Sequence, residues 1–205
     1  MALVMSLLAA CSSGGDASPE TTATTPTVTT EADPTTTVAP TTTEAPTTTI
    51  DTAQVLAAEV EADFLETIRL TDEAFRDPAN DEKVAAALAG YTAANRDFIQ
   101  ERLETFRSMN WVSTPNPSVA ANVIIEEPAR LIPPSSDVVK MQVCEIDSSV
   151  VMEPGAGPNG TDAIVDAELY TYRSVFFLRL VDGRWLAEGS DELGSWTGVQ
   201  TCPDE

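Results

Sequence analysis

The 205-residue sequence contains no histidine, and its 11 basic residues are outnumbered by 33 acidic residues. Without histidine, the chain lacks the commonest general base and the commonest zinc ligand in proteins. The formal charge of −22 repels phosphate backbones and anionic lipid headgroups. We therefore expect no nucleic-acid partner, no metal site and no cofactor, and any membrane attachment has to be covalent.

The first fifty residues lack both basic and aromatic side chains. Between Thr21 and Thr49 the chain has 16 threonines and four prolines. This composition buries too little apolar surface to offset its ordering entropy, so we predict a disordered tether over residues 12–50. Residues 51–205 then form one domain, which carries 28 acids and 11 bases and a formal charge of −17.

Residues 1–11, MALVMSLLAAC, resemble the end of a bacterial lipoprotein signal peptide. The last four of them resemble a lipobox, which implies that Cys11 is lipidated and becomes the new N-terminus. This predicts an extracytoplasmic protein anchored by its lipid to the outer face of the cell membrane. The apolar run is short and no basic residue precedes it, which indicates a start codon upstream of Met1. The alternative is a buried N-terminal helix with a chance cysteine.

Two amphipathic helices are predicted at the start of the domain. Apolar residues recur every fourth position from Leu56 to Ile68, which predicts a helix of about 25 residues from Asp51 or Thr52. A second helix is expected from Asn80 or Asp81, with Gly90 in its middle. Its inward-facing residues are predicted to be Val84, Leu88, Tyr91, Phe98, Leu103 and Phe106.

The pattern changes from helix to strand after Asn110. Strands are predicted over 119–127, 138–147 with an extension to 152, and 163–181, with prolines at 128, 133 and 134 as interruptions. Residues 153–162 read as a hairpin loop. The fold class is therefore α+β: two N-terminal helices packed on a curved antiparallel sheet of four to five strands.

The most distinctive stretch is the hairpin over residues 170–189. Asp182-Gly183 suits a type I′ turn, because both of its central residues need a positive φ. This turn predicts the register, with Leu180 opposite Trp185 and Leu178 opposite Ala187. The Trp185 face is expected to form the floor of the core.

Two of the three cysteines remain to pair with each other if Cys11 is lipidated. The exported location is oxidising, so we predict a disulfide between Cys144 and Cys202 that fastens the C-terminal tail to the sheet. Closing a loop of that length contributes roughly 4 kcal/mol by loop-closure entropy. The alternative is two free thiols, for which the chain offers no activating histidine.

Together these features resemble the cone-shaped α+β fold of the nuclear transport factor 2 (NTF2) and SnoaL-like superfamily, also called cystatin-like. The residues that carry the resemblance are the helix pair, the bent hairpin and the Val181–Trp185 stretch, VDGRW. The lipobox, the threonine-rich tether and the two cysteines Cys144 and Cys202 resemble small exported actinobacterial lipoproteins of that fold. The resemblance implies a fold more than an activity. Catalytic members usually place Asp–His or similar pairs in the cone, and this chain has no histidine.

Three functions follow from this reading. The first is a non-catalytic, membrane-tethered domain that binds a small apolar ligand or a protein partner at the mouth of the cone. Its expected lining is Tyr91, Phe98, Met141, Tyr170, Tyr172, Phe176 and Trp185, with core packing as the alternative role for these residues. The second is a lyase or isomerase that uses a carboxylate in the cone, for which the candidates are Asp97, Glu145, Asp166 and Glu168.

The third is a structural interaction module of the cell envelope that acts through its surface. The sequence also leaves open a homodimer across the open face of the sheet. It identifies no catalytic residue by motif, so we expect the domain to be a binding protein rather than an enzyme.

Overall fold

The computed structural model describes residues 52–203, which form the domain. Its elements are α1 (Thr52–Arg76), α2 (Asp81–Leu88), α3 (Ala93–Ser108), β1 (Val112–Thr114), β2 (Asn122–Leu131), β3 (Val138–Asp147), β4 (Val150–Glu153), the 3-10 turn η1 (Pro158–Gly160), β5 (Ala163–Asp166), β6 (Tyr170–Val181) and β7 (Arg184–Thr197). The predicted signal peptide and tether lie outside the described residues. No helix between Thr52 and Pro203 is both long and apolar enough to cross a membrane.

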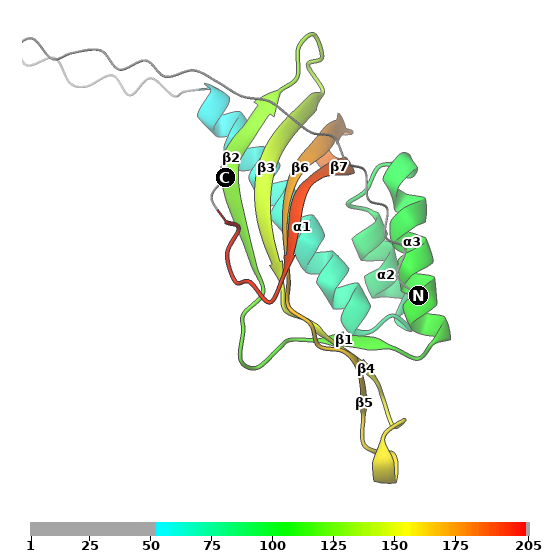
Figure 1. Ribbon diagram of the computed structural model, residues 1–205. Helices are drawn as coiled ribbons and strands as arrows, with labels where there is room; N and C mark the ends of the chain where they lie inside the picture. The colour runs from blue at the N-terminus through cyan, green and yellow to red at the C-terminus, as the bar shows by residue number, and fades with distance from the viewer. Residues whose placement is uncertain (1–51, 204–205) are drawn as a thin grey trace, which may run out of the picture. The chain divides into compact units, whose positions relative to one another are not determined.

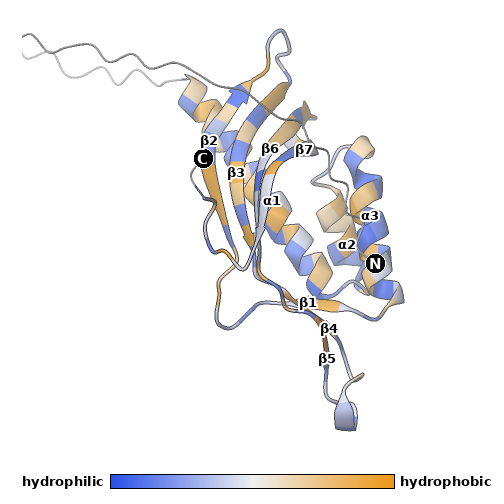
Figure 2. Ribbon diagram, viewed as in Figure 1, coloured by the Kyte–Doolittle hydropathy of each residue, from blue (hydrophilic) through white to orange (hydrophobic). Residues whose placement is uncertain are grey.

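The domain has two layers, with helices on one face of a curved four-stranded antiparallel sheet (Figure 1). The strand order is β2-β3-β6-β7. Helix α1 crosses this sheet and buries Val60 and Phe64 against it, as its apolar stripe predicts. On the sheet side the core is made of Ala129, Val139, Met141, Val143, Leu178 and Trp185. Apolar and polar residues alternate along the strands, as expected for a sheet with one covered face (Figure 2).

The second predicted helix is in fact two helices, which is a correction. The chain leaves the helical path at Gly90 and Tyr91, and their backbone pairs with β7 instead. The Ala187 N–H donates to the Gly90 carbonyl at 2.9 Å, and the Thr92 N–H donates to the Ala187 carbonyl at 3.0 Å. Gly90 is required here because a Cβ would lie 2.5 Å from the buried Thr67 side chain of α1. The break therefore comes from a close tertiary approach rather than from helix propensity.

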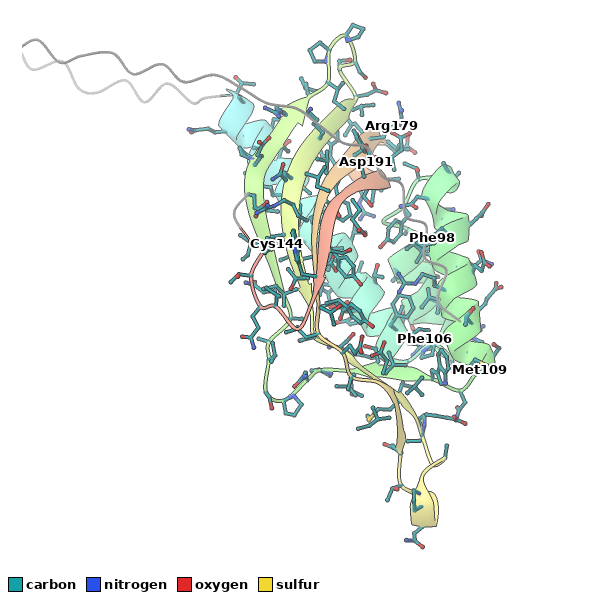
Figure 3. The ribbon with its side chains drawn as sticks, viewed as in Figure 1. Phe98, Phe106, Met109, Cys144, Arg179 and Asp191 are labelled. Carbon is teal, nitrogen blue, oxygen red and sulfur yellow. A yellow bond between two sulfur atoms is a disulfide. The ribbon has the colours of Figure 1, made fainter. Side chains whose placement is uncertain are left out.

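Helices α2 and α3 form a second apolar cluster with the end of α1. Ala74, Ala87, Tyr91, Ile99, Leu103 and Ala187 are buried in it. The prediction that Phe98 faces inward was wrong, because its side chain is 58% exposed. Phe98 instead lies one position before the buried Ile99, on the side of α3 that faces the sheet but outside the packed core (Figure 3).

The first predicted strand is shifted and longer than expected. Strand β2 runs through Pro128 to Leu131, although Pro128 was predicted to interrupt it. The strand tolerates proline because β2 is an edge strand and its pairing with β3 is irregular on both sides of Glu127. Strand β3 has the predicted bounds, 138–147.

A second sheet, which the sequence analysis did not separate from the first, has the order β1-β4-β5. The predicted extension of the second strand is the separate strand β4, and the predicted long strand over 163–181 is divided into β5 and β6. Residues between β4 and β5 form the predicted loop, with Asn159 and Gly160 at positive φ. This long bent hairpin projects beyond the main sheet (Figure 1).

The β6–β7 hairpin has the predicted register. Asp182 and Gly183 have φ values of 50° and 82°, as a type I′ turn requires. Leu180 pairs with Trp185 and Leu178 with Ala187. Trp185 is 4% exposed and belongs to the main core, so this face is the predicted floor.

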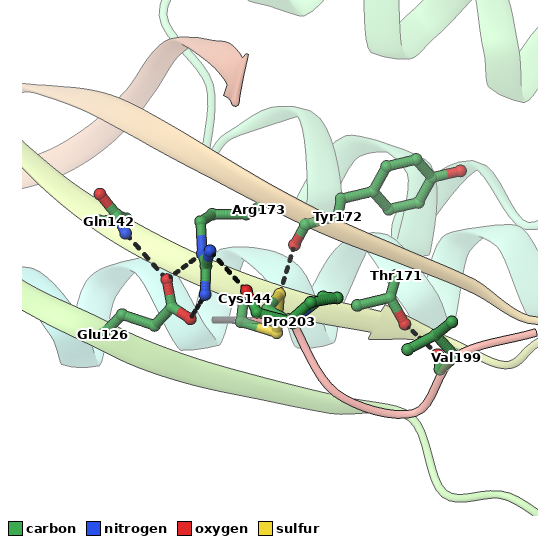
Figure 4. Close-up of a disulfide and its surroundings, with 9 residues drawn as sticks. Glu126, Gln142, Cys144, Thr171, Tyr172, Arg173, Val199 and Pro203 are labelled. Carbon is green, nitrogen blue, oxygen red and sulfur yellow. Dashed lines mark hydrogen bonds and ion pairs between the residues drawn. A yellow bond between two sulfur atoms is a disulfide. The ribbon is translucent and has the colours of Figure 1, made fainter. Parts of the chain in front are cut away.

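The outer face of the sheet, away from the helices, is partly covered by the C-terminal tail (Figure 4). The predicted disulfide between Cys144 and Cys202 is present, with a Cα–Cα distance of 5.9 Å. Beside it, the Thr171 hydroxyl donates to the Val199 carbonyl, and the Arg173 Nη1 donates to the Pro203 carbonyl at 2.9 Å. The tail is thus held to β3 and β6 by one covalent bond and by hydrogen bonds at two further points.

Candidate functional site

Alternation along β3 places one carboxylate on the helix-facing side of the sheet. Val139, Met141 and Val143 all pack in the core under α1. Side chains two residues apart share a face of a strand, so Glu145 and Asp147 continue this row on the same side. Glu145 is also directly opposite Tyr172 of β6, because β3 and β6 pair without a register shift.

The Glu145 carboxylate has no hydrogen bond or ion pair with any residue that the structure describes. The side chain is half-buried. Removal from water is the largest cause that raises the pKa of Glu145, to about 7, and the negative charges of Asp147 and Asp72 add to it. The positive charge of Arg102 opposes this shift. Glu145 is therefore an uncompensated carboxyl group that titrates near neutral pH.

Two tyrosines lie within electrostatic reach of Glu145. Burial raises the pKa of Tyr91, and the hydroxyl of this residue forms a 2.9 Å hydrogen bond with the Thr71 hydroxyl. Burial also raises the pKa of Tyr172, with the charges of Asp147 and Glu145 as the next causes. Both phenols stay protonated at neutral pH. The Thr71 hydroxyl donates to the Thr67 carbonyl at 2.8 Å, so the Tyr91 hydroxyl donates to Thr71 and is left to accept from a bound molecule, whereas the Tyr172 hydroxyl can donate to one.

The surrounding charges come from three elements. Asp72 lies on α1, Asp147 ends β3 and Arg102 lies on α3. Burial raises the pKa of Asp72, and the nearby Asp147 adds to this effect. The Arg102 guanidinium lies over the rings of Phe75 and Phe98, at 5.4 and 5.9 Å from their centroids. The site is thus acidic, with the Arg102 cation held at its edge by aromatic rings and the Arg76 cation near Asp72.

This arrangement supports two kinds of chemistry. An ionised Glu145 accepts a strong hydrogen bond from a cation or a donor, because none of the described residues competes for it. With a pKa near 7, the same group can also take or give a proton at neutral pH. The two tyrosines can orient a ligand by hydrogen bonding in either case.

The predicted pocket residues are distributed over several places. Met141 and Trp185 are buried in the main core, and Phe176 packs against it beside Phe64, with ring centroids 4.7 Å apart. Tyr170 stacks on Tyr172, with ring centroids 6.1 Å apart. The structure thus brings the two β6 tyrosines together near Glu145, and their role in lining a ligand site stays a prediction.

The four carboxylates predicted as alternatives differ in their surroundings. Asp97 is exposed on α3. Asp166 and Glu168 lie near Tyr170, whose hydroxyl donates to Glu168 at 2.8 Å and lies 3.5 Å from an Asp166 oxygen. The hydrogen bond to Glu168 is the main reason that the pKa of Tyr170 is raised to about 12. Glu145 is the one of the four that combines partial burial with a raised pKa.

Sequence reasoning missed Asp147, Asp72, Arg102 and Thr71 as parts of this site. Asp147 could have been found, because it lies two residues after Glu145 in the same predicted strand. The other three lie on helices, and only the tertiary packing brings them to the sheet. No local signal in the sequence points to their meeting.

One group of atoms has the spacing of a metal site but is otherwise engaged. A carboxylate oxygen of Glu126 and the sulfur atoms of Cys144 and Cys202 lie within 4.8 Å of one another. The two sulfurs are bonded to each other, and Glu126 binds Arg173 at 2.7 Å. With the disulfide and the ion pair formed, these residues have a structural role.

Comparison with solved structures identifies the fold. The domain is similar to the intermembrane-space region of the chloroplast protein ARC6, with a TM-score of 0.51 and 9% identity over 67% of this chain and 95% of that one. It is also similar to an NTF2-like protein with a cystatin-like fold from Novosphingobium aromaticivorans (TM-score 0.40, 14% identity, 68% of this chain and 84% of that one). A third match is an NTF2-like protein of unknown function from Shewanella oneidensis (TM-score 0.34, 11% identity, 64% and 97%).

The match to the ARC6 region, with the helix layer on a curved antiparallel sheet, supports the α+β fold class that the sequence predicted. At 9–14% identity the likeness concerns the fold alone, and it carries no activity to this chain. No protein-family model matches the sequence. No curated protein matches it either.

Proposed function

We propose that this NTF2-like domain is the binding module of an extracytoplasmic lipoprotein, and that its inner face binds an amphipathic small molecule at Glu145. The observation that supports the proposal is the half-buried Glu145 carboxylate, which has no partner among the described residues. A partly buried, unpaired carboxylate costs folding stability. Such costs are concentrated at functional sites, where a ligand supplies the missing partner.

The surroundings define the chemical class of the ligand. Asp72 and Asp147 add negative charge near Glu145, so a positively charged group or a neutral hydrogen-bond donor is favoured over an anion. The stacked rings of Tyr170 and Tyr172 offer an apolar surface beside this charge. An aromatic or aliphatic amine combines both features.

Binding can be tested on the full chain with two probes that differ in charge. Tryptamine carries an aromatic ring and an ammonium group, and indole-3-propionate carries the same ring and a carboxylate. We expect isothermal titration calorimetry to detect tryptamine and not indole-3-propionate, and we expect Glu145→Gln to weaken tryptamine binding about tenfold or more. Asp97→Asn removes an exposed acid of α3 and is the matched control.

Native mass spectrometry of the chain purified from an exporting host provides a second readout. A small molecule that is released on denaturation, and that is absent from Glu145→Gln, would support the site. Equal tryptamine binding by the wild type and by Glu145→Gln would contradict it. A preference for the anionic probe would contradict the assigned ligand class.

The second candidate function is proton transfer by a lyase or isomerase. It is favoured by the same carboxyl group, because a base with a pKa of about 7 is suited to abstract a proton at neutral pH. The test is incorporation of deuterium from D₂O into the released small molecule. Incorporation by the wild type but not by Glu145→Gln would make the domain an enzyme, whereas its absence leaves binding alone.

The cellular location is part of the proposal and rests on Cys11, which lies outside the described residues. The lipobox-like sequence before it supports acylation, and the acyl chains would hold the protein at the membrane. Labelling cells with a fatty-acid analogue tests this point. A Cys11→Ala variant that still takes up label, or that stays in the membrane fraction, would contradict it.

A further inference from the structure

A groove of about 660 Å³ lies at the end of the main sheet, far from Glu145 along the strands. It is bounded by the first half of α1, the end of β2 and the β6–β7 turn. Tyr172, which faces Glu145, is eight residues away from Leu180 on β6, so the two places are separate.

The floor of the groove is apolar. Trp185 forms its base with a side chain that is 4% exposed, and Leu56 of α1 lines one side. Leu131 and Leu180 line the other side and are 41% and 38% exposed. Large apolar side chains that stay partly exposed in one hollow are typical of a docking surface.

The rim of the groove is acidic. Glu59 is exposed on α1, and Asp63 is half-buried one turn further on. The Trp185 backbone N–H donates to Asp63 at 2.8 Å, which fixes this carboxylate at the groove. None of the described residues that line the groove is basic.

We propose that the groove docks a short segment of a partner protein in which lysine or arginine residues alternate with apolar residues. The basic side chains pair with Glu59 and Asp63, and the apolar side chains cover Leu180 and Trp185. Charge complementarity selects this occupant, because the rim carries two carboxylates and the described part of the lining has no basic side chain.

The same charges disfavour the two occupants that the chain itself could provide. The segment before position 51 has five acidic residues and no basic one, so it is repelled by the rim. A second copy of the domain carries a formal charge of −17 and is repelled as well. The occupant that these charges favour is therefore a separate protein with basic residues.

The experiment uses the full chain and two synthetic peptides with a fluorescent label, Lys-Leu-Lys-Leu-Lys and Glu-Leu-Glu-Leu-Glu. Fluorescence anisotropy is expected to show saturable binding of the basic peptide that weakens with added salt, and no binding of the acidic peptide. Glu59→Lys is expected to weaken binding about tenfold or more. Glu61→Lys makes the same charge change on α1 but lies outside the lining, and it is expected to change binding less than about twofold.

A second pair of variants tests the apolar floor. Leu180→Ser is expected to weaken the basic peptide several-fold, whereas Leu193→Ser, at a 53% exposed position of β7 outside the lining, is not. Circular dichroism checks that each variant is folded. If Leu180→Ser unfolds, the comparison of Glu59→Lys with Glu61→Lys alone tests the docking proposal, because both positions are on the surface of α1.

Several results would overturn the proposal. Equal weakening by Glu59→Lys and Glu61→Lys would show only non-specific charge attraction. Displacement of the basic peptide by a peptide of residues 35–50 would assign the groove to the preceding segment of the same chain. Self-association that is lost in Glu59→Lys would assign it to a second copy. Normal peptide binding by Glu145→Gln is expected, which separates this proposal from the one at the inner face.

Discussion

Glu126 and Glu145 lie on neighbouring strands of one sheet, yet their carboxylates have opposite surroundings. On the outer face, Glu126 accepts hydrogen bonds from Arg173 at 2.7 and 2.8 Å and from Gln142 at 2.9 Å. The hydrogen bond from Arg173 is the main cause that lowers the pKa of Glu126. On the inner face, burial raises the pKa of Glu145 to about 7, and no residue between Thr52 and Pro203 pairs with this carboxylate.

The comparison distinguishes a structural carboxylate from a functional one. Glu126 and Arg173 are 22% and 11% exposed, so their ion pair is partly desolvated and breaking it is costly. The tail and the disulfide lie beside this pair and add to a closed, fully bonded surface (Figure 4). Glu145 instead lowers the stability of the fold whenever it is ionised, and a binding or catalytic role would explain why such a residue is present.

The largest expected effect is on the outer face. Removing the disulfide in the double variant Cys144→Ala, Cys202→Ser should lower the free energy of unfolding by roughly 4 kcal/mol, because the unfolded chain is no longer restricted by a closed loop. Urea unfolding followed by circular dichroism measures this. The pKa of Glu145 should stay near its wild-type value. A loss below about 1 kcal/mol would show that the tail contributes little.

The ion pair is expected to have the next largest effect. Arg173→Met leaves Glu126 partly buried and without its cation, which should cost about 3 kcal/mol at pH 7. Because the pKa of Glu126 is lowered in the fold, this contribution is present at neutral pH and is lost as the pH falls through the lowered pKa. The difference between variant and wild type should therefore shrink at acidic pH.

Arg130→Met is the control for the ion pair, since its bond to Glu127 lies on the surface with both side chains about half exposed. We expect that variant to change stability by less than about 1 kcal/mol. A cost for Arg173→Met that is equally small, or that is independent of pH, would remove the contrast between the two faces.

On the inner face the pH dependence of stability has the opposite sign. The raised pKa of Glu145 means that the native state binds more protons than the unfolded state between about pH 4.5 and 7. Stability therefore falls as the pH rises through this window. Glu145→Gln should increase the free energy of unfolding by roughly 2 kcal/mol at pH 8 and by almost nothing at pH 4, after allowance for partial exposure.

Thermal unfolding of wild type and variant at the two pH values measures this difference. Glu101→Gln, at an exposed position of α3, is the matched control and should have no effect at either pH. If Glu145→Gln destabilises the domain at pH 8, the carboxylate has a structural partner after all.

The smallest expected effects are on the pKa of Glu145 itself. Asp147→Asn removes a negative charge that raises this pKa, so the pKa should fall. Arg102→Gln removes a positive charge that lowers it, so the pKa should rise. Each change should be on the order of half a unit, measured by NMR titration. Shifts in the same direction for both variants would contradict the described charge arrangement.

Local patterns in the sequence predicted much of the fold. The Asp182-Gly183 turn set the register of β6 and β7, and the apolar stripe of α1 located the helix that covers the sheet. Two cysteines, Cys144 and Cys202, are left if Cys11 is lipidated, and this count predicted the disulfide. Each of these features depends on a few neighbouring residues or on simple pairing.

The incorrect predictions share a tertiary cause. The chain leaves the helix at Gly90, whose backbone bonds to β7 and lies close to the Thr67 side chain. The spacing of apolar residues in the sequence does not reveal these contacts. Pro128 is tolerated because β2 has a free edge and irregular pairing. At the site, Glu145 was a named candidate, but the charges around it depend on where α1 and α3 place Asp72 and Arg102.

The most direct test of this account is the pKa of Glu145 in the full chain. Glutamate labelled with ¹³C at its carboxyl carbon gives one titrating signal per residue, and the signal that is missing in Glu145→Gln identifies the residue. The account predicts a midpoint of about 7 for Glu145, and a lowered pKa for Glu126. A Glu145 midpoint near the ordinary value of about 4.3 would show a solvated or paired carboxylate, and it would contradict the proposed inner-face site.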